Sequence, residues 1–143
     1  MKISLAGTGK MGSAIAARLL SEGHQVTVWN RTAARAEPLL ALGAKRVSSA
    51  RDLCAGADLV ISMLTDEQAL HDVYFGADGL LAGAAPGQMF VDMSTTSSAC
   101  QVEMGLRLGA AGVSYVECPV GGSVGPAKEG KLLGFAGGGA DEL

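Results

Sequence analysis

The segment Gly7-Thr8-Gly9-Lys10-Met11-Gly12 decides the fold, because it stands between two regular elements. The apolar run at residues 3–6 predicts a strand, and the run at residues 13–20 predicts a helix. In such a G-x-G-x-x-G loop the first glycine allows a tight turn and the second lets backbone N–H groups approach a pyrophosphate. The third lets the helix pack closely on the strand, and the helix N-terminus attracts phosphate. We therefore predict a dinucleotide site here rather than a purely structural turn.

Composition and length indicate one α/β domain spanning residues 1–143. The chain is 48% hydrophobic and 17% charged, which is enough apolar material for a sizeable core. A net charge of −3 without a basic stripe argues against a nucleic-acid partner. No apolar run approaches roughly 18 residues, so we expect a cytoplasmic protein without a membrane partner. Cys54, Cys100 and Cys118 lack C-x-x-C spacing, which predicts reduced thiols and no metal site.

Helices and strands alternate along the chain. Apolar helical runs end at glycines, with Gly109 or Gly112 as the stop of the last one, and β-branched runs follow them. This alternation predicts right-handed βαβ units and a Rossmann-type, doubly wound, mostly parallel sheet. The strands are expected at residues 3–6, 26–29, 46–47, 58–63, 89–92 and 113–116, with a last short strand at 132–136.

The second strand ends in Asn30-Arg31-Thr32, where an NAD-selective site carries a carboxylate for the ribose 2′-OH. Asn30 is neutral here, and the guanidinium of Arg31 offers forked donors to a phosphate. These residues therefore favour NADP over NAD. The alternative is that Arg31 is a solvated loop residue and that cofactor choice is loose.

Two more segments follow strands at the edge where an open α/β sheet binds ligands. Met63-Leu64-Thr65 is one, and Thr95 in the other is within reach of a nicotinamide ribose or substrate. From spacing alone, capping of a helix by residues 94–97 is the better explanation, with Thr96 or Ser97 as the cap. Thr65 or Asp66 is expected to cap the helix after the first segment.

A third such loop contains Gly121, Gly122 and Ser123. Its backbone N–H groups suit a substrate carboxylate, although composition alone favours a plain turn.

These motifs together resemble the N-terminal half of the β-hydroxyacid dehydrogenases, the group of 3-hydroxyisobutyrate dehydrogenases and tartronate and glyoxylate/succinic semialdehyde reductases. The resemblance extends over nearly the whole chain. Its most specific parts are V-D-M-S-T at residues 91–95 and P-V-G-G-S at residues 119–123. It implies a site for NADP lined by Met11, Gly12, Asn30, Leu64 and Thr95, and a substrate-carboxylate loop at Gly121, Gly122 and Ser123.

The resemblance also implies reversible hydride transfer between NADP(H) and a small β-hydroxyacid or semialdehyde. In this family a lysine on a helical domain donates the proton, and that domain is expected beyond Leu143. We therefore expect no catalytic residue within the chain, an inactive chain on its own, and a homo-oligomer formed through that domain. Lys128 and Lys131 are expected to be solvated.

The substrate loop departs from the family's usual D-A-P-V-S-G-G, because Gly121 replaces the serine and Ser123 supplies a hydroxyl two positions later. Substrate identity therefore stays open. Residues 23–32 are also similar to imine reductases, which lack the P-V-G-G-S type of loop and rank second. A third possibility is a non-enzymatic NADP-binding or interaction module.

Overall fold

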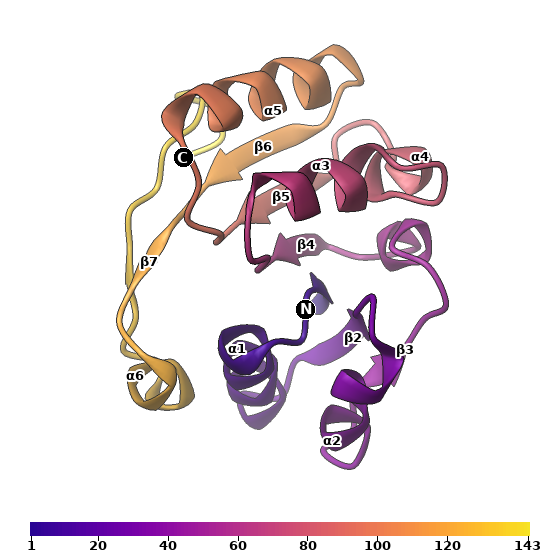
Figure 1. Cartoon of the computed structure of the whole chain (residues 1–143), viewed down its shortest axis with the longest axis vertical. Coiled ribbons are helices and arrows are strands. Elements are labelled where there is room, and N and C mark those ends of the chain that lie inside the picture. The colour runs from indigo at the N-terminus through magenta and orange to yellow at the C-terminus, as the bar shows by residue number, and fades with distance from the viewer.

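A six-stranded sheet runs through the centre of the computed structural model, which describes residues 1–143 (Figure 1). All neighbouring strands are parallel, in the order β3-β2-β1-β4-β5-β6. The winding reverses between β1 and β4, as in a doubly wound dinucleotide-binding sheet, which confirms the predicted Rossmann-type fold. The strands are β1 (Lys2–Ala6), β2 (Gln25–Trp29), β3 (Lys45–Arg46), β4 (Leu59–Ser62), β5 (Met89–Asp92) and β6 (Ser114–Glu117).

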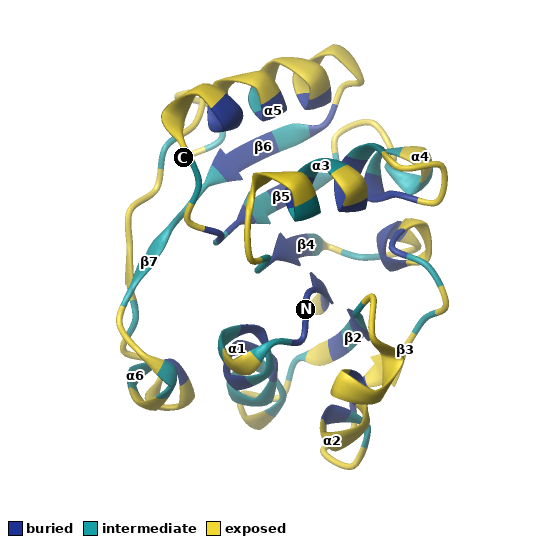
Figure 2. Ribbon diagram, viewed as in Figure 1, coloured by how far each residue is buried: buried dark blue, intermediate teal, exposed yellow.

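Helices cover both faces of the sheet, and two apolar cores result. Ile15 of α1 and Leu39 of α2 join one core, whereas Leu70 of α3 and Met104 of α5 join the other. The strands are mainly buried and the outer faces of the helices are exposed (Figure 2). None of the helices has the length and apolar character needed to cross a membrane. The helices are α1 (Lys10–Ser21), η1 (Ala33–Ala36), α2 (Glu37–Leu40), η2 (Arg51–Cys54), α3 (Glu67–Phe75), α4 (Leu80–Gly83), α5 (Ser98–Ala110) and α6 (Val124–Glu129).

The helix ends follow local side-chain chemistry. Asp66, rather than Thr65, caps α3 by accepting the amide of Ala69 at 2.8 Å. Ser97, rather than Thr96, caps α5. Of the two candidate stops, Gly112 follows the end of α5 with a φ of +73°, a conformation that glycine adopts without strain.

A short antiparallel hairpin stands outside the main sheet. The strand predicted at residues 132–136 forms only as β8 (Leu133–Gly134), which pairs with β7 (Val120–Gly121). The intervening α6 lies beside α1 (Figure 1). Sequence periodicity does not choose a strand's partner, so this pairing was not predicted.

One part of the sheet lacks a helical cover. The crossover from β3 to β4 contains only the four-residue η2, so the face of β1, β2 and β3 opposite α1 stays partly open. Ser4, Thr27 and Lys45 stand side by side there in the strand register.

Candidate functional site

Two glycines of the first loop are required by the protein's own backbone. A Cβ on Gly12 would lie 1.9 Å from the carbonyl oxygen of Gly7, and a Cβ on Gly7 would lie 2.3 Å from that of Met63. Gly9 differs, because a Cβ there would meet no protein atom within 4 Å. Packing of the protein therefore does not demand a glycine at position 9. A glycine is instead expected there if a ligand approaches the backbone.

The N-terminus of α1 opens onto this loop without a side-chain cap. The amides of its first turn therefore have no partner within the helix. The hydroxyl of Thr8 is buried and has no hydrogen-bond partner either. A cavity of about 400 Å³ lies here, lined by Thr8, Gly9, Lys10, Ser13 and Arg35. Unpaired amides, a hydroxyl and two cations form a donor set that suits phosphate oxygens.

Asn30 ties the end of β2 to the glycine loop. Its Oδ1 accepts the amide of Thr8 at 2.9 Å, and its Nδ2 donates to the carbonyl oxygen of Thr32 at 2.9 Å. An ionised aspartate accepts the first bond but has no proton for the second. The neutral amide makes both bonds at once, and it leaves this position without the negative charge that selects NAD.

A second cavity, of about 190 Å³, joins the ends of β1, β2 and β4. Arg35 and Gly9 line both cavities, and η1 places Arg35 four residues after Arg31. Neither arginine forms an ion pair, and the only carboxylate in the lining is Asp72. The lining residues are Gly7, Gly9, Trp29, Asn30, Arg31, Thr32, Arg35, Met63, Leu64, Thr65, Ala69, Asp72 and Val73.

Most of the predicted cofactor residues thus meet around these two cavities, and three do not line them. Gly12 is buried beneath the loop, Met11 packs partly against the core near α1, and Thr95 is exposed after β5. Arg35 was missed by the sequence analysis. Arg31 precedes η1 and Arg35 lies within it, so the spacing of the two arginines carries no helical periodicity that could have shown it.

The segments after β4 and β5 are joined by a buried polar network. Asp92, the last residue of β5, accepts hydrogen bonds from the hydroxyls of Ser62 and Ser94, both at 2.6 Å. The Ser94 hydroxyl in turn accepts the amide of Leu64 at 2.9 Å. Ser94 therefore connects two segments of the site rather than capping α5, a function that the sequence analysis did not assign.

The predicted substrate loop lies outside both cavities. Gly121 belongs to β7, while Gly122 and Ser123 are exposed before α6. The Ser123 side chain makes no capping hydrogen bond to α6. The assignment of these residues to a carboxylate stays a prediction.

Comparison with known proteins matches residues 2–143 to the NAD binding domain of 6-phosphogluconate dehydrogenase. The chain belongs to this family. The phosphate-attracting N-terminus of α1 and the cavity at the switch between β1 and β4 are the features that the NAD-binding domain requires.

The relatives of this NAD-binding domain include oxidoreductases. It is 38% identical over 133 residues to glyoxylate/succinic semialdehyde reductase 2, chloroplastic, of Arabidopsis thaliana, covering 93% of the chain and 37% of that protein. The 3-hydroxyisobutyrate dehydrogenase of Mycobacterium tuberculosis, solved with L-serine, matches with a TM-score of 0.92 and 30% identity. Coverage is 99% of the chain and 47% of that structure. The predicted resemblance to the β-hydroxyacid dehydrogenase group is confirmed.

Two further structures bear on cofactor and reaction. Psf3, solved in complex with NADP+ and 2-OPP, has a TM-score of 0.93 and 31% identity, covering 97% of the chain and 49% of that structure. An imine reductase of Streptomyces aurantiacus has a TM-score of 0.87 and 29% identity, covering 99% of the chain and 48% of that structure. The NAD-binding domain thus spans less than half the length of the relatives described here.

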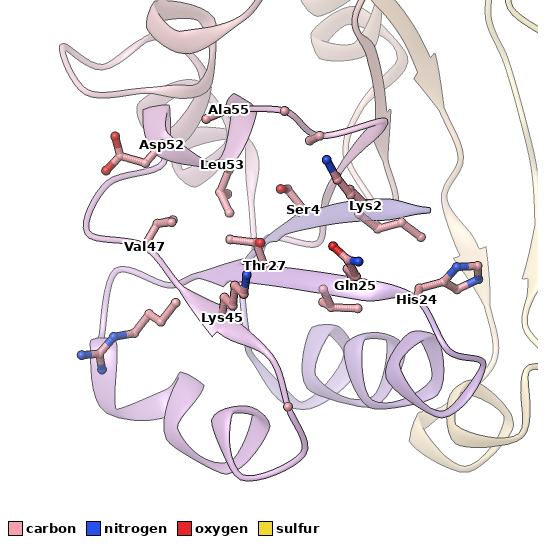
Figure 3. A pocket seen from close by; sticks show the side chains of 16 residues that line it. Lys2, Ser4, His24, Gln25, Thr27, Lys45, Val47, Asp52, Leu53 and Ala55 are labelled. Atoms are coloured by element: carbon pink, nitrogen blue, oxygen red, sulfur yellow. The ribbon is translucent and has the colours of Figure 1, made fainter.

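A larger cavity of the NAD-binding domain, of about 630 Å³, lies on the open face of β1, β2 and β3 (Figure 3). None of the predicted site residues lines it. Its polar floor, which includes Ser4, Gln25 and Thr27, alternates along the strands with apolar residues of the covered face. Such alternation is expected wherever one face of a sheet meets water.

Proposed function

We propose that the chain is the NADP-binding part of an oxidoreductase that transfers a hydride between NADP(H) and a small β-hydroxyacid or semialdehyde. The observation that carries the NADP preference is the pair of unpaired guanidinium groups, Arg31 and Arg35, beside the neutral Asn30. The NADP+ complex of the similar Psf3 structure supports it. The names of the relatives support the substrate class. A cytoplasmic location and a homo-oligomeric whole protein are parts of the same proposal.

Each wall of the site has a distinct task in this proposal. The first-turn amides of α1 and Gly9 bind the pyrophosphate, and Arg31 and Arg35 bind the 2′-phosphate. Leu64 and Thr95 orient the half of the cofactor that reacts. The bound nicotinamide supplies or accepts the hydride, while the protein contributes binding and orientation. Residues 121–123 bind the substrate carboxylate through backbone N–H groups.

Cofactor preference is the first test. We expect NADPH to bind at least several-fold more tightly than NADH, because only NADPH offers a phosphate to the two arginines. Arg31→Ala should weaken NADPH binding and leave NADH binding almost unchanged. Arg35→Ala should weaken NADPH binding more than NADH binding, because Arg35 also lines the cavity at the phosphate loop. Fluorescence titration measures all of these affinities. Lys45→Ala, which removes a cation from the open face instead, should change neither, and equal affinities of the unmodified chain for both cofactors would contradict the preference.

Turnover is the second test. We expect this chain to bind NADP(H) without turning over hydroxyacids, since loss of a general acid costs roughly 10²–10⁴ in rate. Lys128 and Lys131 are exposed, and Lys131 pairs with Glu129 at 2.8 Å. The assay presents NADP(H) with small hydroxyacids and semialdehydes, and with cyclic imines because of the similar imine reductase. Turnover at ordinary enzyme rates would assign proton transfer to a residue of this chain and overturn the proposed division of labour.

A further inference from the structure

The side chain of Asp92 is fully buried, yet no cation lies beside it. It forms no ion pair, and its residue has no exposed surface. Four hydrogen-bond donors surround it instead: both Ser62 and Ser94 hydroxyls, the Ser94 amide at 3.2 Å, and Nε2 of Gln101 at 2.8 Å. Both carboxyl oxygens of Asp92 therefore have hydrogen-bond partners.

The side chains that donate to Asp92 are oriented by further hydrogen bonds from two tyrosines. The Ser62 hydroxyl donates to Asp92, so the Tyr74 hydroxyl, 2.8 Å from it, must donate to Ser62. The Tyr115 hydroxyl likewise donates to Oε1 of Gln101 at 2.6 Å. Burial raises the pKa of Tyr74 and of Tyr115, which keeps both hydroxyls protonated. The tyrosine hydroxyls therefore donate toward the groups that bind Asp92, while the second Nε2 proton of Gln101 goes to the Thr96 hydroxyl at 2.6 Å.

This network ends at the wall of the cofactor cavity. The Ser94 hydroxyl, oriented by Asp92, accepts the amide of Leu64. A Cβ built on Gly7 would lie 3.0 Å from Cδ2 of Leu64 and 2.3 Å from the carbonyl oxygen of Met63. The segment Met63–Leu64, which the network holds, therefore packs directly against Gly7, the first glycine of the phosphate loop.

Stability alone is a poor reason for such a network. Burying a charge is costly, and well-packed apolar side chains of similar volume often stabilise a protein as well or better. Tyr74 and Phe90 already supply large buried apolar groups around the same strands. Polar groups that a core does not need are expected where a site must be held in one geometry.

We propose that Asp92 is a positioning residue for the cofactor site, acting through the Ser94 hydroxyl to fix Leu64 against the glycine loop. The inference rests on the proposed binding of NADP(H). Asp92 itself touches no cofactor in this proposal. It sets the one orientation of Ser94 in which the hydroxyl accepts the Leu64 amide.

The test compares NADPH affinity and the fluorescence of the bound nicotinamide in variants, at temperatures where all of them are folded. Asp92→Leu removes both accepting oxygens at similar volume, and Ser94→Ala leaves the Leu64 amide unpaired. Each should weaken NADPH binding about tenfold and alter the nicotinamide emission, since an unpaired buried group loses about one such factor. Met104→Ala is the matched control, because it removes buried volume from the same core and Met104 makes none of the network's hydrogen bonds. It should lower the melting temperature and leave affinity unchanged.

A conservative variant tests the hydrogen-bond logic directly. Asp92→Asn keeps Oδ1, which accepts from both serine hydroxyls and from the Ser94 amide, and it turns a donor only toward Gln101, whose side-chain amide can rotate to accept. Asp92→Asn should therefore keep the NADPH affinity that Asp92→Leu loses. If the unmodified chain does not bind NADPH, the proposed function is wrong. If it binds, and Asp92→Leu and Ser94→Ala bind equally well, only the inference about Asp92 is overturned.

Discussion

Two glycine-rich loops follow strands in this domain, and they differ in what surrounds their glycines. In the loop at residues 7–12, added Cβ atoms would collide with backbone carbonyl oxygens, at 1.9 Å for Gly12 and 2.3 Å for Gly7. In the loop at residues 121–125, a Cβ on Gly121 would lie 3.3 Å from the ring of Phe135, an exposed side chain. Backbone cannot yield, whereas an exposed side chain can. The first loop's shape is therefore fixed by the fold itself.

The largest effect is expected at the position where backbone meets backbone. Gly12→Ala should destabilise the protein by about 3 kcal/mol, because overpacking here forces α1 away from the glycine loop. Denaturation in urea measures the change in the free energy of unfolding. Gly121→Ala is the matched substitution in the other loop, and it should cost less than about 1 kcal/mol because Phe135 can move. Equal costs at the two positions would remove the distinction between the loops.

The next effect is a loss of cofactor affinity without a loss of folding, at one position of the first loop. Gly9→Val should weaken both NADPH and NADH at least about a hundredfold, or about 2.7 kcal/mol, because the side chain occupies the space of the pyrophosphate. The fold should survive, since nothing in the protein lies within 4 Å of the added Cβ. Circular dichroism and fluorescence titration report these two properties separately. A folded variant with normal affinity would show that the loop does not hold the pyrophosphate.

The smallest expected effect is an increase in the stability of the protein. Gly125 lies in the first turn of α6, and a Cβ there would also meet no atom within 4 Å. Gly125→Ala should raise the free energy of unfolding by about 0.5–1 kcal/mol, because alanine restricts the unfolded chain and favours the helix. Affinity for NADPH should stay unchanged. Thermal unfolding with and without cofactor measures both, and a loss of affinity would place the second loop nearer to the cofactor than we propose.

The fold was largely predictable because its signals are local. Residues 3–6, 26–29 and 89–92 are apolar runs bounded by glycines and caps, and each forms a strand of the parallel sheet. The β7–β8 hairpin was not predictable in the same way. Its four paired residues carry no periodicity of their own, and their pairing depends on how α6 packs against α1.

The site was predictable where a residue's type reveals its task. The structure shows why the residue type matters at three positions. A side chain on Gly7 or Gly12 would collide with backbone, and the amide of Asn30 bonds the glycine loop. Arg35 and Asp92 were missed, because their tasks arise from position. Arg35 joins two cavities only through the turn of η1, and Asp92 meets its donors only when β4 and β5 lie side by side.

Met63 and Gly7 come from different segments, and both line the cavity at the ends of β1, β2 and β4. This origin of the cavity has a thermodynamic consequence. The cofactor cavity exists only when segments from the first, second and fourth strands have assembled, so the unfolded chain has no equivalent site. By mass action, a ligand that binds only the native state at a hundred times its Kd adds about 2.7 kcal/mol to the free energy of unfolding. If NADP(H) binds as we propose, cofactor concentration sets the stability of the domain as well as the occupancy of its site.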